Sequence, residues 1–92
     1  MAVYVDTARY PFGRMIMCHM SADSLEELHD MARRIGISRR WFQCPPKASH
    51  PHYDICKSKR RSAVEQGAIE IADRDLLPIA RRLTAEWTVA QR

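Results

Sequence analysis

The sequence predicts one α/β domain over residues 1–92, in which a three- or four-stranded sheet packs against about three helices. Short runs of β-forming residues alternate along the chain with segments whose apolar residues recur every three or four positions, as is typical of this fold class. A length of 92 residues suffices for one hydrophobic core, and a hydrophobic share of 46% with a charged share of 28% is that of a folded globular protein. We therefore expect a single folded unit without internal repeats.

Two strands are expected near the N-terminus. Residues 3–5 are β-forming, and Asp6 closes this run. A loop of residues 7–14, which contains Pro11 and Gly13, then leads to a second apolar run at residues 15–20. Alternation along a strand places Met15, Met17 and His19 on one face of this run, with Ile16, Cys18 and Met20 on the other.

The clearest helix is expected after Ser24. Ser24 and Glu27 have the spacing of a capping box, in which each side chain satisfies a free backbone amide at the helix start. Gly36 has the position of a residue that ends a helix in the left-handed conformation. The core-facing side of this helix consists of four apolar residues at helical spacing: Leu25, Leu28, Ala32 and Ile35.

The middle of the chain is expected to hold a third strand and a second helix. Residues 39–43 form a short run with two aromatic side chains. Pro45 and Pro46 must end this strand, because proline cannot donate a hydrogen bond to a neighbouring strand. Asp54 is expected to cap a second helix that extends to Gln66, with Gly67 directly after its end.

A fourth strand and a last helix are expected in the C-terminal quarter of the chain. Residues 68–71 have the composition of a short strand. Asp73 or Asp75 is expected to cap the helix that follows, in which Pro78 falls early enough to be tolerated. The apolar stripe of this helix would consist of Leu76, Ile79, Ala80, Leu83 and Trp87.

The net charge of the chain is concentrated in residues 45–61. This segment holds five basic residues and one acidic residue, and the whole chain has a net charge of +4, so the remaining residues are neutral in sum. A basic loop that leads into a helix start, flanked by aromatic rings, predicts binding of a phosphate-bearing ligand, either nucleic acid or a nucleotide. A solvated basic surface without a ligand is the alternative. The candidate ligand-binding residues are Arg9, Arg14, Trp41, Lys47, Ser49, Tyr53, Lys57, Lys59 and Arg60.

Histidine and carboxylate side chains indicate a second hypothesis, metal-assisted hydrolysis of a phosphoester. In an extended chain, the spacing His50-x-His52-x-Asp54 would place three potential ligands of a divalent metal, zinc or manganese, on one face. Asp6 and His19 from neighbouring strands could complete a ligand set of Asp6, His19, His52 and Asp54. Without a metal, His52 and Asp54 could form a catalytic acid/base pair, and helix capping by Asp54 is the purely structural alternative.

Cysteine usage and hydropathy bear on location and partners. Cys18, Cys44 and Cys56 form no C-x-x-C pair, so we expect free thiols and a reducing, cytoplasmic location. No apolar run approaches the roughly 18 residues that a membrane-spanning helix needs, so no membrane partner is expected. A third functional hypothesis is a protein interaction module, in which the last helix around Trp87 docks on a partner or on a second copy of the chain as a homo-oligomer.

Seven short motifs occur in fixed order along residues 2–72. They are Tyr4-Val5-Asp6, Met17-Cys18-His19-Met20, Ala22-Asp23-Ser24-Leu25-Glu26-Glu27-Leu28-His29, Arg40-Trp41-Phe42-Gln43, Pro46-Lys47-Ala48-Ser49, His52-Tyr53-Asp54-Ile55 and Lys59-Arg60. With these motifs the sequence resembles a family of small bacterial and phage proteins catalogued only as a domain of unknown function. The resemblance implies no activity, but it implies that nine motif positions are site candidates: Asp6, His19, Trp41, Lys47, His52, Tyr53, Asp54, Lys59 and Arg60.

Overall fold

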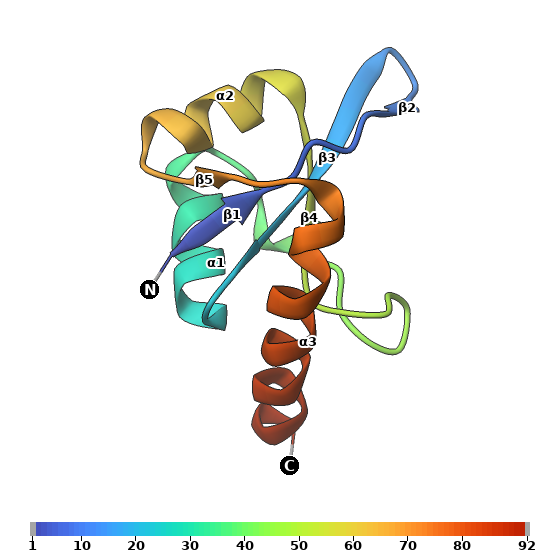
Figure 1. Cartoon of the computed structure of the whole chain (residues 1–92), viewed down its shortest axis with the longest axis vertical. Coiled ribbons are helices and arrows are strands. Elements are labelled where there is room, and N and C mark those ends of the chain that lie inside the picture. The colour runs from blue at the N-terminus through green and yellow to red at the C-terminus, as the bar shows by residue number, and fades with distance from the viewer. Residues whose placement is uncertain (1, 92) are drawn as a thin grey trace.

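Strand β3 (Met15–Ala22) is the centre of the fold (Figure 1). The structure, a computed structural model, describes residues 2–91. The other elements are, in chain order, β1 (Val3–Val5), β2 (Tyr10–Phe12), α1 (Leu25–Arg34), the 3-10 helix η1 (Arg39–Trp41), β4 (Tyr53–Cys56), α2 (Lys57–Glu65), β5 (Ile69–Glu70) and α3 (Asp73–Ala90). The predicted α/β class is confirmed, although the sheet of the described residues has five strands rather than three or four.

Strand β3 pairs with neighbours along both of its edges. Strand β4 pairs with one edge of β3, and β2 and then β1 pair with successive parts of the other edge. All three pairings are antiparallel, so Met17 and Met20 each have a partner on both sides. Strand β5 extends the sheet beyond β1 in the parallel direction. Residues 7–9, between β1 and β2, form a bulge, because only Cys18 of β3 lies between the partners of Asp6 and Tyr10.

The prediction of a continuous loop at residues 7–14 was wrong for its second half, which holds β2. Tyr10 and Phe12 are β-forming residues, and Gly13 has a φ of 61°, which suits the first position of a two-residue hairpin turn. Pro11 is tolerated because β2 lies at the edge of the sheet. The hairpin of β2 and β3 projects from the rest of the molecule (Figure 1).

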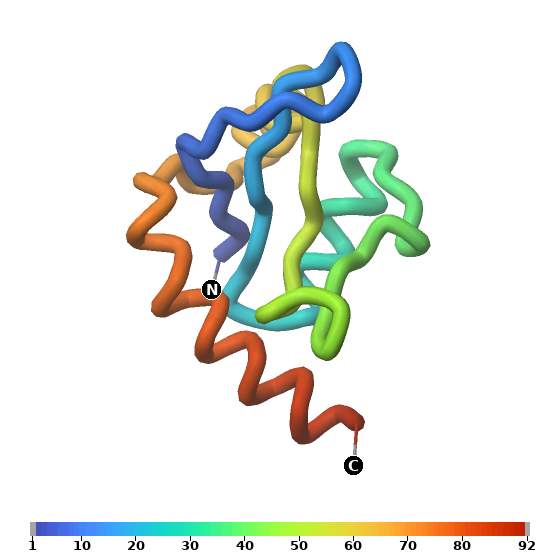
Figure 2. The backbone as a smooth tube through the Cα atoms, turned by 90° about the vertical axis from the view of Figure 1, so that its right-hand side faces the viewer, coloured from blue at the N-terminus to red at the C-terminus, as the bar shows by residue number. Residues whose placement is uncertain are grey.

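Two elements of the middle third differ from the prediction. Residues 39–43 are not a strand. Residues 39–41 form η1, in which Ser38 Oγ accepts the amide of Arg40 and the amide of Phe42 donates to the backbone oxygen of Arg39. Gln43 makes only an isolated bridge to His52. Asp54 does not cap a helix either, because it lies inside strand β4. Tyr53 and Ile55 of this strand are buried, whereas Asp54 and Cys56 between and after them are only partly buried. The loop of residues 44–51 and helix α2 consequently lie at opposite ends of β4 (Figure 2).

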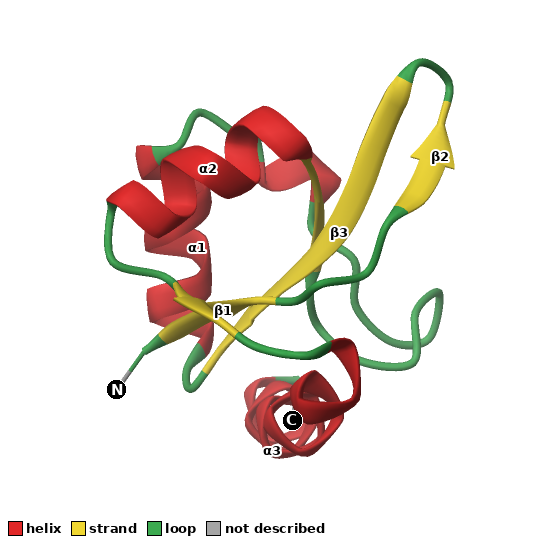
Figure 3. Cartoon of the chain, turned by 45° about the horizontal axis from the view of Figure 1, so that its top comes forward, coloured by secondary structure: helices red, strands yellow, loops and turns green. Residues whose placement is uncertain are grey.

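The helices cover both faces of the sheet. Helices α1 and α2 lie against one face and α3 against the other (Figure 3). The core between the sheet and the first two helices contains fully buried side chains from strands and helices alike: Val5, Met20, Leu28, Tyr53, Ile55 and Ala63. Alternation along β3 is as predicted, since Cys18 and Met20 face this core while Met17 and His19 are only partly buried on the opposite face.

The helix ends follow the sequence signals in part. The amide of Glu27 donates to Ser24 Oγ over 3.2 Å, and Gly36 after α1 and Gly67 after α2 have φ values of 84° and 105°, as the predicted caps require. Helix α3 begins directly after Ala72, so the prediction of a cap by Asp73 or Asp75 was wrong. Four residues of its predicted apolar stripe are buried, namely Leu76, Ile79, Ala80 and Leu83, whereas Trp87 is only partly buried.

Two further features are the state of the cysteines and the apolar character of the helices. Cys18, Cys44 and Cys56 are free thiols. Among the helices of residues 2–91, none combines the length and the apolar character needed to cross a membrane.

Candidate metal centre

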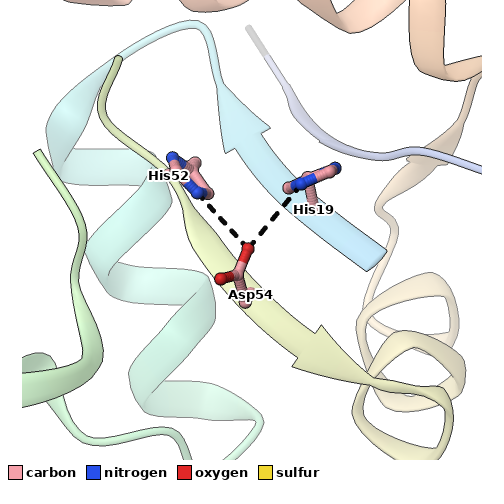
Figure 4. A group of neighbouring side chains, drawn as sticks. All are labelled: His19, His52 and Asp54. Atoms are coloured by element: carbon pink, nitrogen blue, oxygen red, sulfur yellow. Dashed lines mark ion pairs between the residues drawn. The ribbon is translucent and has the colours of Figure 1, made fainter. Parts of the chain in front are cut away.

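Three predicted ligands, His19, His52 and Asp54, converge where β3 meets β4 (Figure 4). The register of the sheet pairs His19 directly with Asp54, so their side chains are neighbours on one face. His52 precedes Asp54 by two residues in an extended segment and therefore lies on the same face. One potential ligand atom from each side chain lies within 4.8 Å of the other two.

The distances within this cluster suit a common cation. Asp54 Oδ1 lies 3.3 Å from His52 Nε2 and 3.8 Å from His19 Nε2. Bonds of roughly 2.0–2.2 Å from a tetrahedral ion to nitrogen and oxygen ligands would separate the ligand atoms by about 3.3–3.6 Å. Small side-chain movements would therefore bring all three atoms to bonding distance of one ion.

Both imidazole rings are oriented by their second nitrogen. His19 Nδ1 lies 2.7 Å from Asp6 Oδ2, and His52 Nδ1 lies 2.9 Å from the backbone oxygen of His50. An ionised carboxylate and a carbonyl oxygen only accept hydrogen bonds, so each Nδ1 carries the hydrogen and each neutral ring has its lone pair on Nε2. A histidine that binds a metal through one nitrogen and donates the other N–H to a carboxylate or carbonyl has this arrangement.

The Asp54 carboxylate has one satisfied and one unsatisfied oxygen. Oδ2 accepts a hydrogen bond from Gln43 Nε2. Oδ1 is buried and has no hydrogen-bond partner among the described residues, although both imidazoles turn Nε2 toward it. A buried polar atom without a partner costs free energy, and a cation between these three acceptors would remove that cost.

The electrostatics of the cluster keep its carboxylates ionised. Burial acts to raise the pKa of Asp54, but contacts with His52, Tyr10 and Gln43 outweigh it and lower the pKa to about 2. Burial likewise acts against ionisation of Asp6, yet the hydrogen bonds from the His19 ring and amide hold its pKa below the usual value. The Asp6 carboxylate in turn raises the pKa of His19.

Asp6 is not positioned as a metal ligand, which corrects the predicted set of four. Its side chain is 1% exposed, and both of its oxygens are occupied. Oδ2 meets His19 Nδ1, while Oδ1 accepts the amides of His19 and Ala8 over 2.9 and 3.3 Å. Asp6 therefore orients His19, and the candidate centre consists of the three side chains that converge.

Three further residues border the centre. The ring of Tyr10 lies 5.2 Å from that of His19, and the ring of His50 lies 4.8 Å from that of His52. Tyr10 was not a predicted site residue, because residues 7–14 were expected to be a loop. Gln43 was not predicted either, because its contact with Asp54 depends on an isolated bridge to His52. The spacing His50-x-His52-x-Asp54 predicted His50 as a potential metal ligand. In the structure, its backbone oxygen orients His52.

The predicted basic site is divided between two ends of β4. Lys47 and Ser49 lie in the loop before the strand, whereas Lys57, Lys59 and Arg60 lie in the helix after it (Figure 2). Lys59 points toward the end of α1, since a Cβ atom on Gly36 would lie 3.2 Å from its Nζ. Arg14 lies in the turn of the hairpin. Of the predicted basic residues, Arg9, Lys57 and Arg60 line a common hollow beside β3.

The aromatic candidates have different environments. Tyr53 is fully buried and its hydroxyl meets His29 Nδ1 at 2.8 Å, so the interpretation of Tyr53 as a ligand-binding residue was wrong. Trp41 is 58% exposed, and Arg40 lies 5.0 Å from the centre of its ring. Trp87, the expected anchor of an interaction surface, is partly buried and packs near Phe42 of the same chain, with 5.8 Å between ring centres.

Most of the chain matches the model of one protein family. Residues 3–83 match the model of a family described as "Protein of unknown function (DUF4031)". No curated protein and no solved structure matches the chain. The matched range includes the three residues of the centre and Asp6.

Proposed function

Because the chain belongs to the DUF4031 family, whose description assigns no activity, we propose its function from its own geometry. The proposed function is metal-assisted hydrolysis of a phosphoester, with zinc or manganese bound by His19, His52 and Asp54. One observation carries the proposal. The buried Asp54 Oδ1 has no hydrogen-bond partner that meets the geometric criteria among the described residues, and the Nε2 atoms of two imidazoles converge on it.

A metal ion explains this convergence better than an acid/base pair does. A proton on His52 Nε2 would satisfy Asp54 Oδ1 and make the pair His52–Asp54 that the sequence also predicts. That proton would leave the Nε2 lone pair of His19 without a donor, although Asp6 orients the ring toward the same oxygen. One cation satisfies all three acceptors at once.

The centre is suited to hydrolysis because three protein ligands leave room for water. A divalent metal in such a site lowers the pKa of bound water from about 15.7 to roughly 7 and so supplies hydroxide at neutral pH. His19 is one-third exposed, at 33%, so solvent and a substrate can reach this side of the cluster. Asp6 and Gln43 hold His19 and Asp54 in place and reduce the movement needed during the reaction.

The substrate class follows from charge. The chain has a net charge of +4, and a phosphate-bearing substrate such as a nucleotide or nucleic acid is the anion that its basic segment was expected to hold. The proposal retains Lys47 and Ser49 as substrate contacts, because the loop that carries them leads directly into His52.

Metal content of the purified protein tests the first half of the proposal. After treatment with a chelator and reloading, we expect one equivalent of zinc or manganese per chain by elemental analysis. Asp54→Asn and His19→Asn should lose this equivalent, whereas His29→Asn, which removes an imidazole outside the cluster, should keep it. Equal metal content in Asp54→Asn and the unmodified protein would refute the centre.

Hydrolysis of bis(p-nitrophenyl) phosphate tests the second half. Reloaded protein should release p-nitrophenol, and Asp54→Asn should reduce this rate to that of the buffer. The His29→Asn variant again serves as the control. A protein that holds one metal per chain but hydrolyses neither this ester nor a p-nitrophenyl monophosphate would contradict the proposed reaction.

A further inference from the structure

A small hollow lies on the other face of β3. It has a volume of about 240 Å³ and is bounded by the bulge of residues 7–9, by β3 and by the first turns of α2. Cys18 lines this hollow, while the next residue, His19, belongs to the metal centre. Consecutive side chains of a strand point to opposite faces, so the hollow and the centre are separate sites.

Three cationic side chains surround the hollow: Arg9, Lys57 and Arg60. None of the described residues that line it is acidic. Within residues 2–91, neither Arg9 nor Lys57 takes part in an ion pair. The charges of Arg9 and Lys57 are therefore not offset by an acidic partner, and a bound anion would be attracted to both of them and to Arg60.

Arg60 is held in place before any ligand arrives. Its Nε donates to the backbone oxygen of Asp6 over 3.0 Å, and one terminal nitrogen lies 2.7 Å from Glu70. Glu70 is itself largely exposed and lies outside the lining of the hollow. A guanidinium fixed in this way loses little conformational entropy when its remaining N–H groups bind an oxyanion.

The rest of the hollow is neutral and mostly apolar. Ala8, Ile16 and Met17 contribute to its lining. Burial raises the pKa of Cys18 to about 11, so its thiol is uncharged at neutral pH. Lys57 is the first residue of α2, so the positive end of that helix dipole also faces this region.

We propose that the hollow binds a small phosphomonoester. Its phosphate group would lie among Arg9, Lys57 and Arg60, and its apolar part would contact Ala8 and Ile16. A volume of about 240 Å³ is below the roughly 300–1,000 Å³ typical of pockets for drug-sized ligands, which limits the ligand to a small molecule. This site does not depend on the proposed metal centre.

Calorimetric titration of metal-free protein with phenyl phosphate tests the proposal. We expect saturable binding at one site per chain, and Arg9→Gln and Lys57→Gln should each weaken it at least about tenfold, as expected for loss of a charge-assisted contact. Lys59→Gln and Arg14→Gln remove one positive charge from the same helix and the same hairpin, outside the hollow. These controls should change the affinity less than about twofold.

Three outcomes would overturn the proposal. The first is the absence of saturable binding by phenyl phosphate. The second is an equal loss of affinity in the two variants and the two controls, which would indicate a diffuse effect of net charge. The third is tight binding of single-stranded DNA that depends on Arg9 and Lys57 while phenyl phosphate does not bind, which would assign the surface to nucleic acid instead. Asp54→Asn should leave phenyl phosphate affinity unchanged, which separates this test from that of the metal centre.

Discussion

The metal centre and the basic hollow lie on opposite faces of β3 and have opposite electrostatic imbalances. At the centre, a carboxylate oxygen and two imidazole nitrogens converge; at the hollow, Arg9 and Lys57, which have no ion-pair partner among the described residues, lie beside Arg60, which pairs with Glu70. Each arrangement costs free energy in the isolated chain. An excess of acceptors or of cations at a preorganised site therefore indicates the charge of the ligand that the site would bind.

The two sites also differ in how their side chains are held. His19 and Asp54 are paired residues of neighbouring strands, and Asp6 and Gln43 fix their polar atoms. In the hollow, Arg60 is anchored, whereas Arg9 belongs to a bulge and Lys57 is exposed at a helix start. We therefore expect high selectivity for ligand geometry at the centre and greater tolerance at the hollow.

The largest expected effect is stabilisation by metal. A zinc concentration about 100 times the dissociation constant should raise the free energy of unfolding by about 2.7 kcal/mol, because the ion binds the folded state. Thermal unfolding with and without zinc measures this shift. Asp54→Asn should show none of it, and a similar shift in that variant would place the ion elsewhere.

A smaller effect is expected from the residue that orients a ligand. Asp6→Asn should weaken metal binding by about 10- to 100-fold, as loss of a carboxylate behind a metal-bound histidine typically does, while keeping one equivalent at saturation. Asp23→Asn is the matched control, because Asp23 also accepts a backbone amide next to β1, far along β3 from His19. Unchanged metal affinity in Asp6→Asn would show that the orientation of His19 does not matter.

The hollow should respond to the removal of a charge in the absence of ligand. Lys57→Gln should raise the free energy of unfolding by about 0.3 kcal/mol at low salt, because it relieves repulsion around the hollow and an unfavourable charge at a helix start. The gain should vanish near 1 M salt, where the charges are screened. Denaturant unfolding at both salt concentrations measures it, and a loss of stability at low salt would contradict the repulsion.

The smallest effect concerns an imidazole outside both sites. Burial, followed by the nearby Arg39 charge, lowers the pKa of His29 below 6.5 in the folded state. As the pH falls below about 6.5, the unfolded chain takes up this proton first, so stability falls until the pH passes the folded pKa. His29→Gln should flatten this loss in unfolding measured between pH 7 and pH 5, while an unchanged slope would assign the loss to other groups.

Much of the fold could be predicted from local patterns, but β4 could not. Residues 54–66 read as one helix because Asp54 suits a cap and no breaking residue separates β4 from α2. The strand becomes evident only through its pairing with Met17–Met20 of β3, which is far away in sequence. Assigning Asp54 to a strand moves it from a helix cap into the metal centre.

The site residues show the same division. His19, His52 and Asp54 could be chosen from residue type and spacing, because those chemistries are visible in the sequence. Two facts could not be chosen in this way: Asp6 contacts His19 and is not one of the converging side chains, and Tyr53 is buried. Both depend on which face each strand turns inward. The basic residues were grouped by sequence distance, but the length of β4 places Lys47 and Lys57 at different ends of the strand.

The pairing of β3 along both edges also has a consequence for motion. The amide of His19 donates to the buried Asp6 carboxylate, and Met20 pairs with β1 and β4 together. Exchange of these amide hydrogens with solvent therefore requires the sheet to separate, and their protection should approach that of global unfolding. The backbone beneath the proposed metal centre would thus remain fixed for far longer than a catalytic cycle, while the amides of the exposed residues Thr7, Arg9 and Lys47 would exchange quickly.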